Sequence, residues 1–307
     1  MLKYFIRRCL SILPVLLVVS ILVFLFVHLL PGDPARVVAG PDADEATINR
    51  IRTELGLDKS LPEQYLTYMG RLFRGDLGKS LSSKLPVAQE IALRFPPTLY
   101  LALTSLAWSI IIGILFGAYA AMHRGKWQDY TAMIVAVSGI SMPQFWLGLL
   151  LMQLFAVHLG WLPVTGFTGK FKELILPSLT LGASVAAIIA RFTLSSFLDV
   201  FQEEYINTAR AKGLPERVVM WKHAFRNALI PVVTMVGLQF GFLLGGSVVV
   251  ETVFAWPGLG RYMIESVSVR DYPVLQALLL LYSFQFVIIN LLVDMLYAVI
   301  NPEIRYK

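Results

Sequence analysis

The sequence predicts an all-α membrane protein with six transmembrane helices. Hydrophobic residues account for 57% of its 307 residues and charged residues for only 15%, and its mean hydropathy of +0.68 lies far outside the range of ordinary soluble domains. A helix that crosses the hydrocarbon core of a bilayer needs about 20 apolar residues. Six stretches reach that length: residues 9–30, 99–122, 131–158, 175–198, 229–250 and 274–300.

The first stretch is expected to stay in the mature protein as a helix. It is too long and uninterrupted for the core of a signal peptide, and Pro31-Gly32-Asp33-Pro34 follows it in place of a small-residue cleavage site. The third stretch is longer than one crossing needs and contains Pro143. It is therefore either one kinked helix or two shorter segments, and we expect one kinked helix.

A small helical cap is expected between the first two spans. Turn formers divide this region into a short helix near 44–55, a turn at Gly56, a second helix near 62–73 and a glycine-containing loop at 75–78. The chain therefore divides into an N-terminal helix (1–30), an outer, periplasmic extension (31–98) and a five-helix core (99–307) whose polar loop covers 199–228.

Lys and Arg in the short loops predict that both termini are cytoplasmic. One side contains only four such cations, Lys170, Lys172, Arg261 and Arg270. The other side contains twelve: Lys3, Arg7, Arg8, Arg124, Lys126, Arg210, Lys212, Arg217, Lys222, Arg226, Arg305 and Lys307. The net charge of +6 reflects this bias and the long outer loop, so we expect no nucleic-acid partner.

Nucleotide-binding motifs and catalytic groupings are not supported. Gly78-Lys79-Ser80 lacks the glycine that a phosphate-binding loop needs at position 73, and Gly258-Leu259-Gly260 lacks a third glycine at 263. The four histidines show no metal-binding spacing, Cys9 is the only cysteine, and no Gly-x-Ser-x-Gly elbow occurs. We therefore expect no cofactor, no metal and no enzymatic activity in this chain.

The most distinctive polar segment lies between the fourth and fifth spans. Its cations alternate with small residues, which suits docking into a protein groove better than adhesion to anionic lipid, the alternative reading. We expect a docking element of two short helices broken at Gly213-Leu214-Pro215. Its candidate contact residues are Thr208, Ala209, Arg210, Ala211, Lys212, Gly213, His223, Arg226, Asn227 and Pro231.

Two features inside the spans suggest helix contacts. Gly237, Gly241 and Gly245 share one face of a helix, which Gly246 extends; this face serves either packing within the chain or a subunit interface or moving wall. Arg191 and Asp294 lie at similar depth, and charges inside a membrane need partners, so we hypothesise that they pair. Alternatively, the Arg191 side chain extends to the cytoplasmic lipid headgroups, and Asp294 contacts a polar group on a helix such as Asn290.

An aromatic and turn-forming segment follows the fifth span directly on the outer side. It contains Trp256, Pro257, Gly258 and Gly260, which suit a re-entrant or interfacial segment; a plain aromatic belt explains Trp256 almost as well.

The polar segment resembles the ATPase-docking loop of ATP-binding cassette (ABC) importer permeases of the dipeptide, oligopeptide and nickel family. The resemblance rests on the runs 205–213 and 222–231 and on six further motifs in the same order. These motifs lie at 31–34, 55–58, 75–78, 256–260, 270–273 and 301–305. The generic loop begins Glu-Ala-Ala, whereas Asn207-Thr208-Ala209 stand here, and Pro231 lies farther beyond the glycine than usual.

This resemblance implies a type I ABC importer permease fold in a bacterial inner membrane. It also implies a second homologous permease subunit, cytoplasmic ABC ATPases that supply the energy, a periplasmic substrate-binding protein and surrounding membrane lipid. The run 237–246 is most similar to the glutathione-importing branch, so the expected cargo is a dipeptide, an oligopeptide or a peptide-like solute such as glutathione. The alternatives are a nickel-complex importer, a stand-alone secondary transporter and an intramembrane enzyme.

Overall fold

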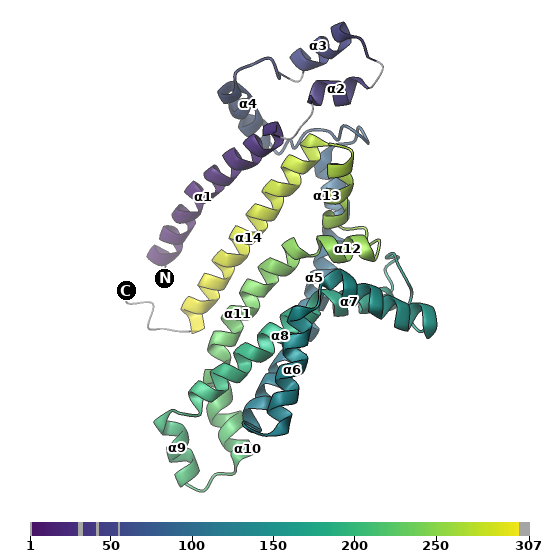
Figure 1. Cartoon of the computed structure of the whole chain (residues 1–307). Coiled ribbons are helices and arrows are strands. Elements are labelled where there is room, and N and C mark those ends of the chain that lie inside the picture. The colour runs from purple at the N-terminus through teal and green to yellow at the C-terminus, as the bar shows by residue number, and fades with distance from the viewer. Residues whose placement is uncertain (1, 30–32, 41–42, 55, 301–307) are drawn as a thin grey trace.

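The computed structural model describes residues 2–29, 33–40, 43–54 and 56–300 as a set of helices (Figure 1). No β-strand occurs among these residues, and one isolated bridge pairs Lys79 with Pro86. The elements are α1 (Leu2–Leu29), α2 (Pro34–Ala39), α3 (Glu45–Glu54), α4 (Leu61–Phe73), α5 (Val87–Met122), α6 (Trp127–Ser141), α7 (Gln144–Leu151), the π-helical turn η1 (Met152–His158), α8 (Phe171–Val200), α9 (Glu204–Ala211), α10 (Glu216–Val218), the π-helical turn η2 (Val219–Ala224), α11 (Phe225–Gly246), α12 (Val248–Val253), α13 (Leu259–Ser268) and α14 (Tyr272–Ile300).

Within the described residues, four helical stretches are long and apolar enough to cross a membrane. They are Val87–Met122, Phe171–Val200, Glu216–Gly245 and Tyr272–Leu296, which match the second, fourth, fifth and sixth predicted spans. Two shorter apolar segments, Leu10–Phe26 within α1 and Gln144–His158, fall in the first and third predicted spans. The structure therefore confirms an all-helical membrane protein but not the count of six spans.

The third predicted span is not one kinked helix. Met142 (φ −79°, ψ 129°) and Pro143 (φ −58°, ψ 131°) are extended, so α6 ends at Ser141 and α7 begins at Gln144. Proline lacks the N–H that would continue the helix, and its ring disfavours helical backbone at the preceding residue. After the break, α7 and η1 turn away from the axis of α6 (Figure 1).

Helix α8 lies at the centre of the core, packed against α5, α6 and α11. Glycines permit its close approach to α5, because a Cβ on Gly117 would lie 2.4 Å from the carbonyl oxygen of Ala190 and one on Gly182 would lie 2.5 Å from Oγ of Ser109. Ser109 also donates a 2.8 Å hydrogen bond to the Gly182 carbonyl. The pairing of α5 and α8 is the most extensive contact between two helices of the described chain.

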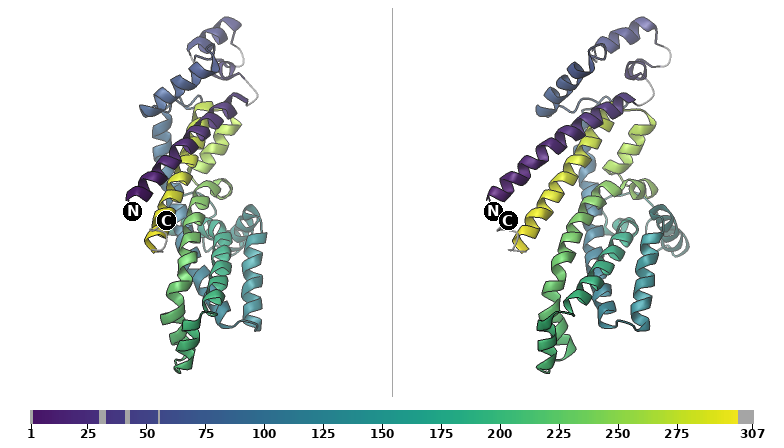
Figure 2. Two further views of the ribbon diagram at one scale, coloured as in Figure 1. Left: turned by 90° about the vertical axis from the view of Figure 1, so that its left-hand side faces the viewer. Right: turned by 60° about the vertical axis from the view of Figure 1, so that its left-hand side comes forward.

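Helices α1 and α14 run side by side, and the small helices α2, α3 and α4 form a cap beyond the end of α1 at Leu29 and the start of α14 at Tyr272 (Figures 1 and 2). The segment of α9 and α10 lies at the opposite end of the molecule from this cap (Figure 1). Helix α5 begins at Val87, within the predicted extension 31–98. The predicted motif at 301–305 and the cations Arg305 and Lys307 lie outside the described residues.

Candidate functional site

The polar segment between α8 and α11 folds into two short helical pieces joined by a tight turn at Gly213. The Gly213 amide donates to the Arg210 carbonyl at 2.9 Å and the Leu214 amide to the Ala209 carbonyl at 3.4 Å, which ends α9. Gly213 has φ +74°, a left-handed conformation that side chains with a Cβ adopt only with strain. The chain then starts α10 after Pro215, as the sequence predicts.

One face of this segment is buried against the ends of the core helices. Ile206 is fully buried and Ala209 is 5% exposed. They belong to an apolar cluster formed by Ala118, Ala120, Ala121, Leu194, Phe197, Ile206, Ala209, Val219, Met220, Ala224 and Ala228. The serine hydroxyl of Ser196 on α8 also donates a 2.7 Å hydrogen bond to the Ala228 carbonyl. The segment is therefore attached to α5, α8 and α11 through packed side chains.

The other face presents cations to the outside. Arg210 donates to both carboxylate oxygens of Glu216, at 2.7 and 3.3 Å, and its guanidinium lies 5.4 Å from the ring centroid of Phe201. Asn227 donates to the hydroxyl of Tyr205 at 2.7 Å. Of the ten candidate contact residues, Ala209 is buried and His223 is half-buried. The exposed ones are Thr208, Arg210, Ala211, Lys212, Gly213, Arg226, Asn227 and Pro231.

A cavity of about 400 Å³ opens beside this face. Arg124, Gln202, Arg210 and Glu216 give it a polar rim. Its apolar lining consists of Ala121, Met122, Leu198, Phe201 and Met220. Such a surface can receive a protein element that offers an apolar side chain with acidic groups around it.

On the opposite side of the molecule, the segment after α11 wraps around a buried carboxylate, Glu251. Thr98 and Ser247 donate to its Oε1 at 2.8 and 2.9 Å, and the amides of Gly260 and Arg261 donate to its Oε2 at 2.7 and 3.1 Å. The two amides belong to the first turn of α13, where the helix dipole also favours an anion. Glu251 thus ties α5, α12 and α13 together.

Burial of Glu251, which lies beyond the end of the span Glu216–Gly245, raises the pKa of its carboxyl above the ordinary value, and the four hydrogen bonds act in the opposite direction. Glu251 is not among the site residues predicted from the sequence. A carboxylate placed directly after an apolar span and before a glycine-rich turn is the signal that could have found it.

The motif Trp256-Pro257-Gly258-Leu259-Gly260 is part of the core rather than an aromatic belt. Trp256 is fully buried, stacks on Phe167 at 4.2 Å and donates through Nε1 to the Pro97 carbonyl at 3.0 Å. A Cβ at Gly258 would lie 2.4 Å from Oε2 of Glu251, and one at Gly260 would lie 2.6 Å from Cα of Val248. The two glycines are needed so that the turn can approach the carboxylate.

Two further predicted motifs, on the side of the cap, meet each other. Ser80 and the Ser82 amide donate to the buried carboxylate of Asp271, at 2.5 and 3.2 Å. A Cβ at Gly78 would touch Pro273 at 3.6 Å. The loop near 75–82 is therefore held against the start of α14.

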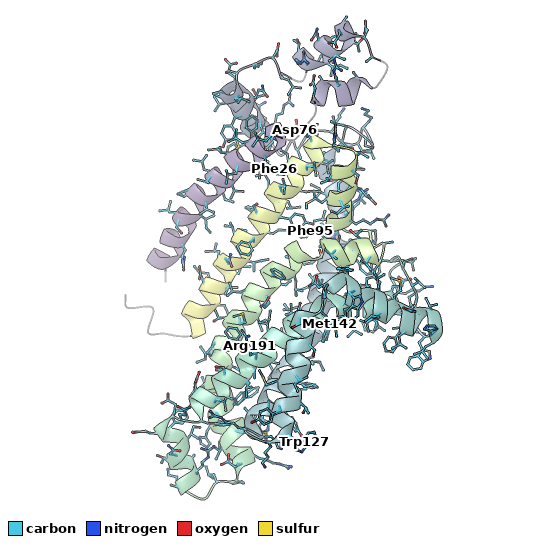
Figure 3. The ribbon with its side chains drawn as sticks, in the orientation of Figure 1. Phe26, Asp76, Phe95, Trp127, Met142 and Arg191 are labelled. Carbon is cyan, nitrogen blue, oxygen red and sulfur yellow. The ribbon has the colours of Figure 1, made fainter. Side chains whose placement is uncertain are left out.

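The predicted ion pair between Arg191 and Asp294 is wrong. Asp294 pairs with Arg8 of α1 at 3.0 Å, while Arg191 lies exposed on α8 (Figure 3). The reason is helix adjacency, since α14 packs against α1 and α11, whereas α8 packs against α5, α6 and α11. Similar depth in a membrane does not bring two residues together when another helix lies between them.

The glycines of α11 do not all have the same surroundings. A Cβ at Gly237 would lie 2.3 Å from Cγ2 of Val293, and one at Gly241 would lie 3.4 Å from Phe286, so both face α14 within the chain. A Cβ at Gly245 would meet nothing within 4 Å. Gly246 ends α11, and its surroundings are outside the described residues.

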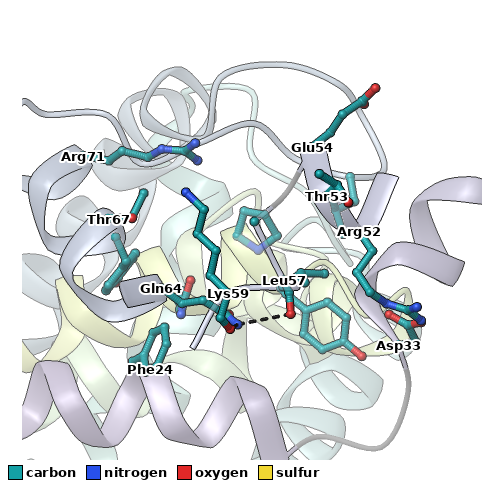
Figure 4. Close-up of a pocket in the computed structure, with 16 residues that line it drawn as sticks. Phe24, Asp33, Arg52, Thr53, Glu54, Leu57, Lys59, Gln64, Thr67 and Arg71 are labelled. Carbon is teal, nitrogen blue, oxygen red and sulfur yellow. Dashed lines mark hydrogen bonds and ion pairs between the residues drawn. The ribbon is translucent and has the colours of Figure 1, made fainter. Parts of the chain in front are cut away.

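A second cavity, of about 540 Å³, lies beneath the cap (Figure 4). Arg52 pairs there with Asp33 at 2.5 Å, Gln64 donates to the Leu57 carbonyl at 3.3 Å, and Lys59 and Arg71 also line the cavity. Both signs of charge are therefore available to a polar solute. Among the described residues, no group of three or more His, Cys, Asp or Glu could hold a metal ion.

Comparison with known proteins identifies related sequences over the whole chain. Residues 113–306 match the model of the family "Binding-protein-dependent transport system inner membrane component", and residues 1–102 match its N-terminal companion. The chain is 61% identical to the glutathione transport system permease protein GsiC of Pectobacterium atrosepticum and 58% identical to that of Escherichia coli K12; each alignment covers both chains completely.

Solved structures show the same fold at low sequence identity. An inward-facing MetNI methionine ABC transporter chain superimposes with a TM-score of 0.61 at 20% identity, covering 69% of this chain and 97% of the other. A chain of an amino acid ABC transporter gives a TM-score of 0.55 at 17% identity, covering 68% and 93%. These matches establish the fold of an ABC importer permease.

Proposed function

The chain belongs to the family of inner membrane components of binding-protein-dependent transport systems, it is a permease subunit of an ABC importer rather than an enzyme, and we propose that its cargo is glutathione. The observation that carries the proposal is the identity of about 60% over the full length with permeases named for glutathione transport. Dipeptides, oligopeptides and nickel complexes are the competing cargoes.

The polar segment from α9 to η2 is proposed to receive the motion of the ATPases. When ATP closes them, a displacement of α9 acts on the core helices through Ile206 and Ala209, because these side chains are packed among the ends of α5, α8 and α11. Close packing of this kind transmits displacement instead of absorbing it. The exposed cations and the 400 Å³ cavity provide the surface on which the ATPases dock.

The partners follow from the two ends of the molecule. A second homologous permease forms the other half of the pathway, ATPases bind on the α9 side, and a periplasmic substrate-binding protein docks on the cap side. With this orientation the start of α1 lies in the cytoplasm, as the distribution of Lys and Arg predicts. Membrane lipid covers the exposed apolar faces of the spans.

The test is ATP-dependent uptake by the complete importer in proteoliposomes, with the binding protein added outside. Radiolabelled glutathione should accumulate only with ATP, and excess unlabelled dipeptide or nickel chelate should not compete. Accumulation of a dipeptide or nickel complex without glutathione uptake would assign a different cargo. Gradient-driven uptake by the isolated chain would overturn the importer mechanism itself.

A further inference from the structure

Helix α7 covers the start of this face of α8, near Thr180. In the half of α8 that follows Ser184, three sides are covered by other helices and the fourth is open. On the α5 side, a Cβ at Gly117 would meet Ala190 and Thr193. On the α6 side, a Cβ at Gly139 would meet Ala183 and Ala187.

On the third side, Ser196 binds the α11 carbonyl of Ala228. The residues between these three contact lines lie at helical spacing on one face: Ser184, Ile188, Arg191 and Ser195. Arg191 and Ser195 are exposed and Ile188 is partly exposed, whereas Ser184 accepts a 3.5 Å hydrogen bond from Nε2 of Gln144 on α7.

The chemistry of this open face differs from that of the lipid-facing surfaces. Between Phe171 and Tyr205 no large hydrophobic side chain is exposed in the described chain. In contrast, α14 exposes Phe284, Phe286 and Leu292, and α5 exposes Ile111 and Phe116. A span that contacts acyl chains needs such an apolar surface. Serine and arginine side chains are typical of a surface that faces water or protein.

Arg191 has no carboxylate or other acceptor among the residues that the structure describes. It lies nine residues before the end of α8 at Val200, about 13 Å along the axis at 1.5 Å per residue. A guanidinium at that depth is costly unless it faces a water-filled space or an anion. Its expected partner, Asp294, is bound by Arg8.

We propose that this face of α8 lines the aqueous pathway shared with the second permease, and that Arg191 binds a carboxylate of the anionic peptide-like solute as it passes. The inference rests on the proposed function and adds a specificity-determining residue to it. Glutathione carries two carboxylates and one ammonium group, and the planar guanidinium binds a carboxylate through two parallel hydrogen bonds. The exposure and position of Arg191 thus match the charge of the proposed cargo.

The test places a cysteine at position 191 in the complete importer. Because Cys9 is the only native cysteine of this chain, a Cys9→Ser chain is the background and control for labelling of the other subunits. Arg191→Cys is treated with membrane-impermeant methanethiosulfonates that add either an ethylammonium-type cation or an ethylsulfonate anion. Leu292→Cys, at a position 61% exposed on α14, is the lipid-facing control, and Ser195→Cys is the control on the open face.

The expected result has two parts. Positions 191 and 195 react with the aqueous reagents and position 292 does not. Glutathione uptake by Arg191→Cys falls at least about tenfold, the cost of one charge-assisted contact; the cationic adduct and Arg191→Lys recover much of it, and the anionic adduct recovers none.

Three results would overturn the proposal: an unreactive position 191 with and without ATP, unchanged uptake by Arg191→Cys, or equal recovery with both adducts. Co-purification of the ATPases with each variant shows that the complex has assembled. Labelling at 191 does not depend on the cargo, so a failure of glutathione uptake by the unmodified complex counts against the proposed function alone.

Discussion

The hydroxyl of Thr98 donates a 2.8 Å hydrogen bond to the buried carboxylate of Glu251. The hydroxyl oxygen of Thr98 also accepts a 2.8 Å hydrogen bond from the amide of Leu259. One side chain of α5 thereby holds both the carboxylate and the start of α13, so α12, the start of α13 and α5 near Thr98 form one unit.

Replacing Glu251 with Gln should destabilise this unit. The amide offers one acceptor oxygen in place of two and turns N–H donors toward groups that are donors themselves, which costs about 2–4 kcal/mol. Thermal unfolding of the purified complex in detergent should shift to lower temperature. Glu265→Gln is the control, because its carboxylate is 52% exposed and pairs only with Arg261 in the described structure; equal unfolding temperatures for the two variants would contradict the role of Glu251.

Gly213→Val should uncouple ATP hydrolysis from transport. A Cβ there would meet nothing within 4 Å, so the effect comes from the left-handed backbone, which costs a β-branched residue about 1–2 kcal/mol. Gly125→Val is a matched control, since Gly125 has the same φ of +74° and the same open surroundings in the turn before α6. Glutathione uptake per ATP hydrolysed should fall for position 213 and stay unchanged for 125.

Arg210→Glu should weaken association with the ATPases by reversing a charge on the exposed face. Glu216→Gln should have little effect on stability, since a pair that is 37% and 64% exposed contributes about 1 kcal/mol or less. Co-purification of the ATPases measures their association with each variant, and thermal unfolding measures the stability of Glu216→Gln. The double variant Arg210→Glu, Glu216→Arg restores the pair within the segment; full recovery of binding in it would mean that Arg210 serves only the local turn.

Gly237→Ala and Gly245→Ala should separate packing within the chain from contact with another subunit. The methyl group at 237 collides with Val293, and such overpacking costs about 1–3 kcal/mol. The methyl group at 245 has open space and should leave the stability of this chain unchanged. The second measurement is co-purification of the second permease. If Gly245→Ala loses this subunit and Gly237→Ala keeps it, the second permease contacts the face of α11 at Gly245.

Asp294→Arg should loosen α1 from α14, and combining it with Arg8→Asp should restore the contact. Both side chains are partly exposed, 46% for Arg8 and 34% for Asp294, so the expected effect on stability is about 1 kcal/mol. The amount of folded protein in detergent measures it. Recovery through Arg191→Asp in place of Arg8→Asp would instead support the pair that the structure rejects.

Hydropathy and turn chemistry predict the helices well, because the length of a span and the conformation of Gly213 are local properties. The break at Pro143 is different. Proline favours an interruption there, but the direction that α7 takes afterwards depends on what it packs against, including Gly148, where a Cβ would lie 3.1 Å from Phe254. The choice between a kink and a break is therefore a tertiary property.

The sequence alone also does not predict the partner of Asp294 or the role of Glu251. Depth along a helix can be counted from residue numbers, but the order of helices around the core cannot. The donors to Glu251 come from three elements, with Thr98 lying 153 residues away in the chain, so the pattern around Glu251 alone does not reveal them.

The length of α5 has a mechanical consequence. Between Thr98, which binds Glu251, and Met122, which lies beside the polar segment, its axis measures roughly 36 Å at 1.5 Å per residue. If a rod of that length pivots by about 10° about its Thr98 end, its Met122 end moves sideways by roughly 6 Å. Helix α5 can thus act as a lever: a small tilt at the end near Thr98 becomes a displacement of several ångströms at the end near Met122.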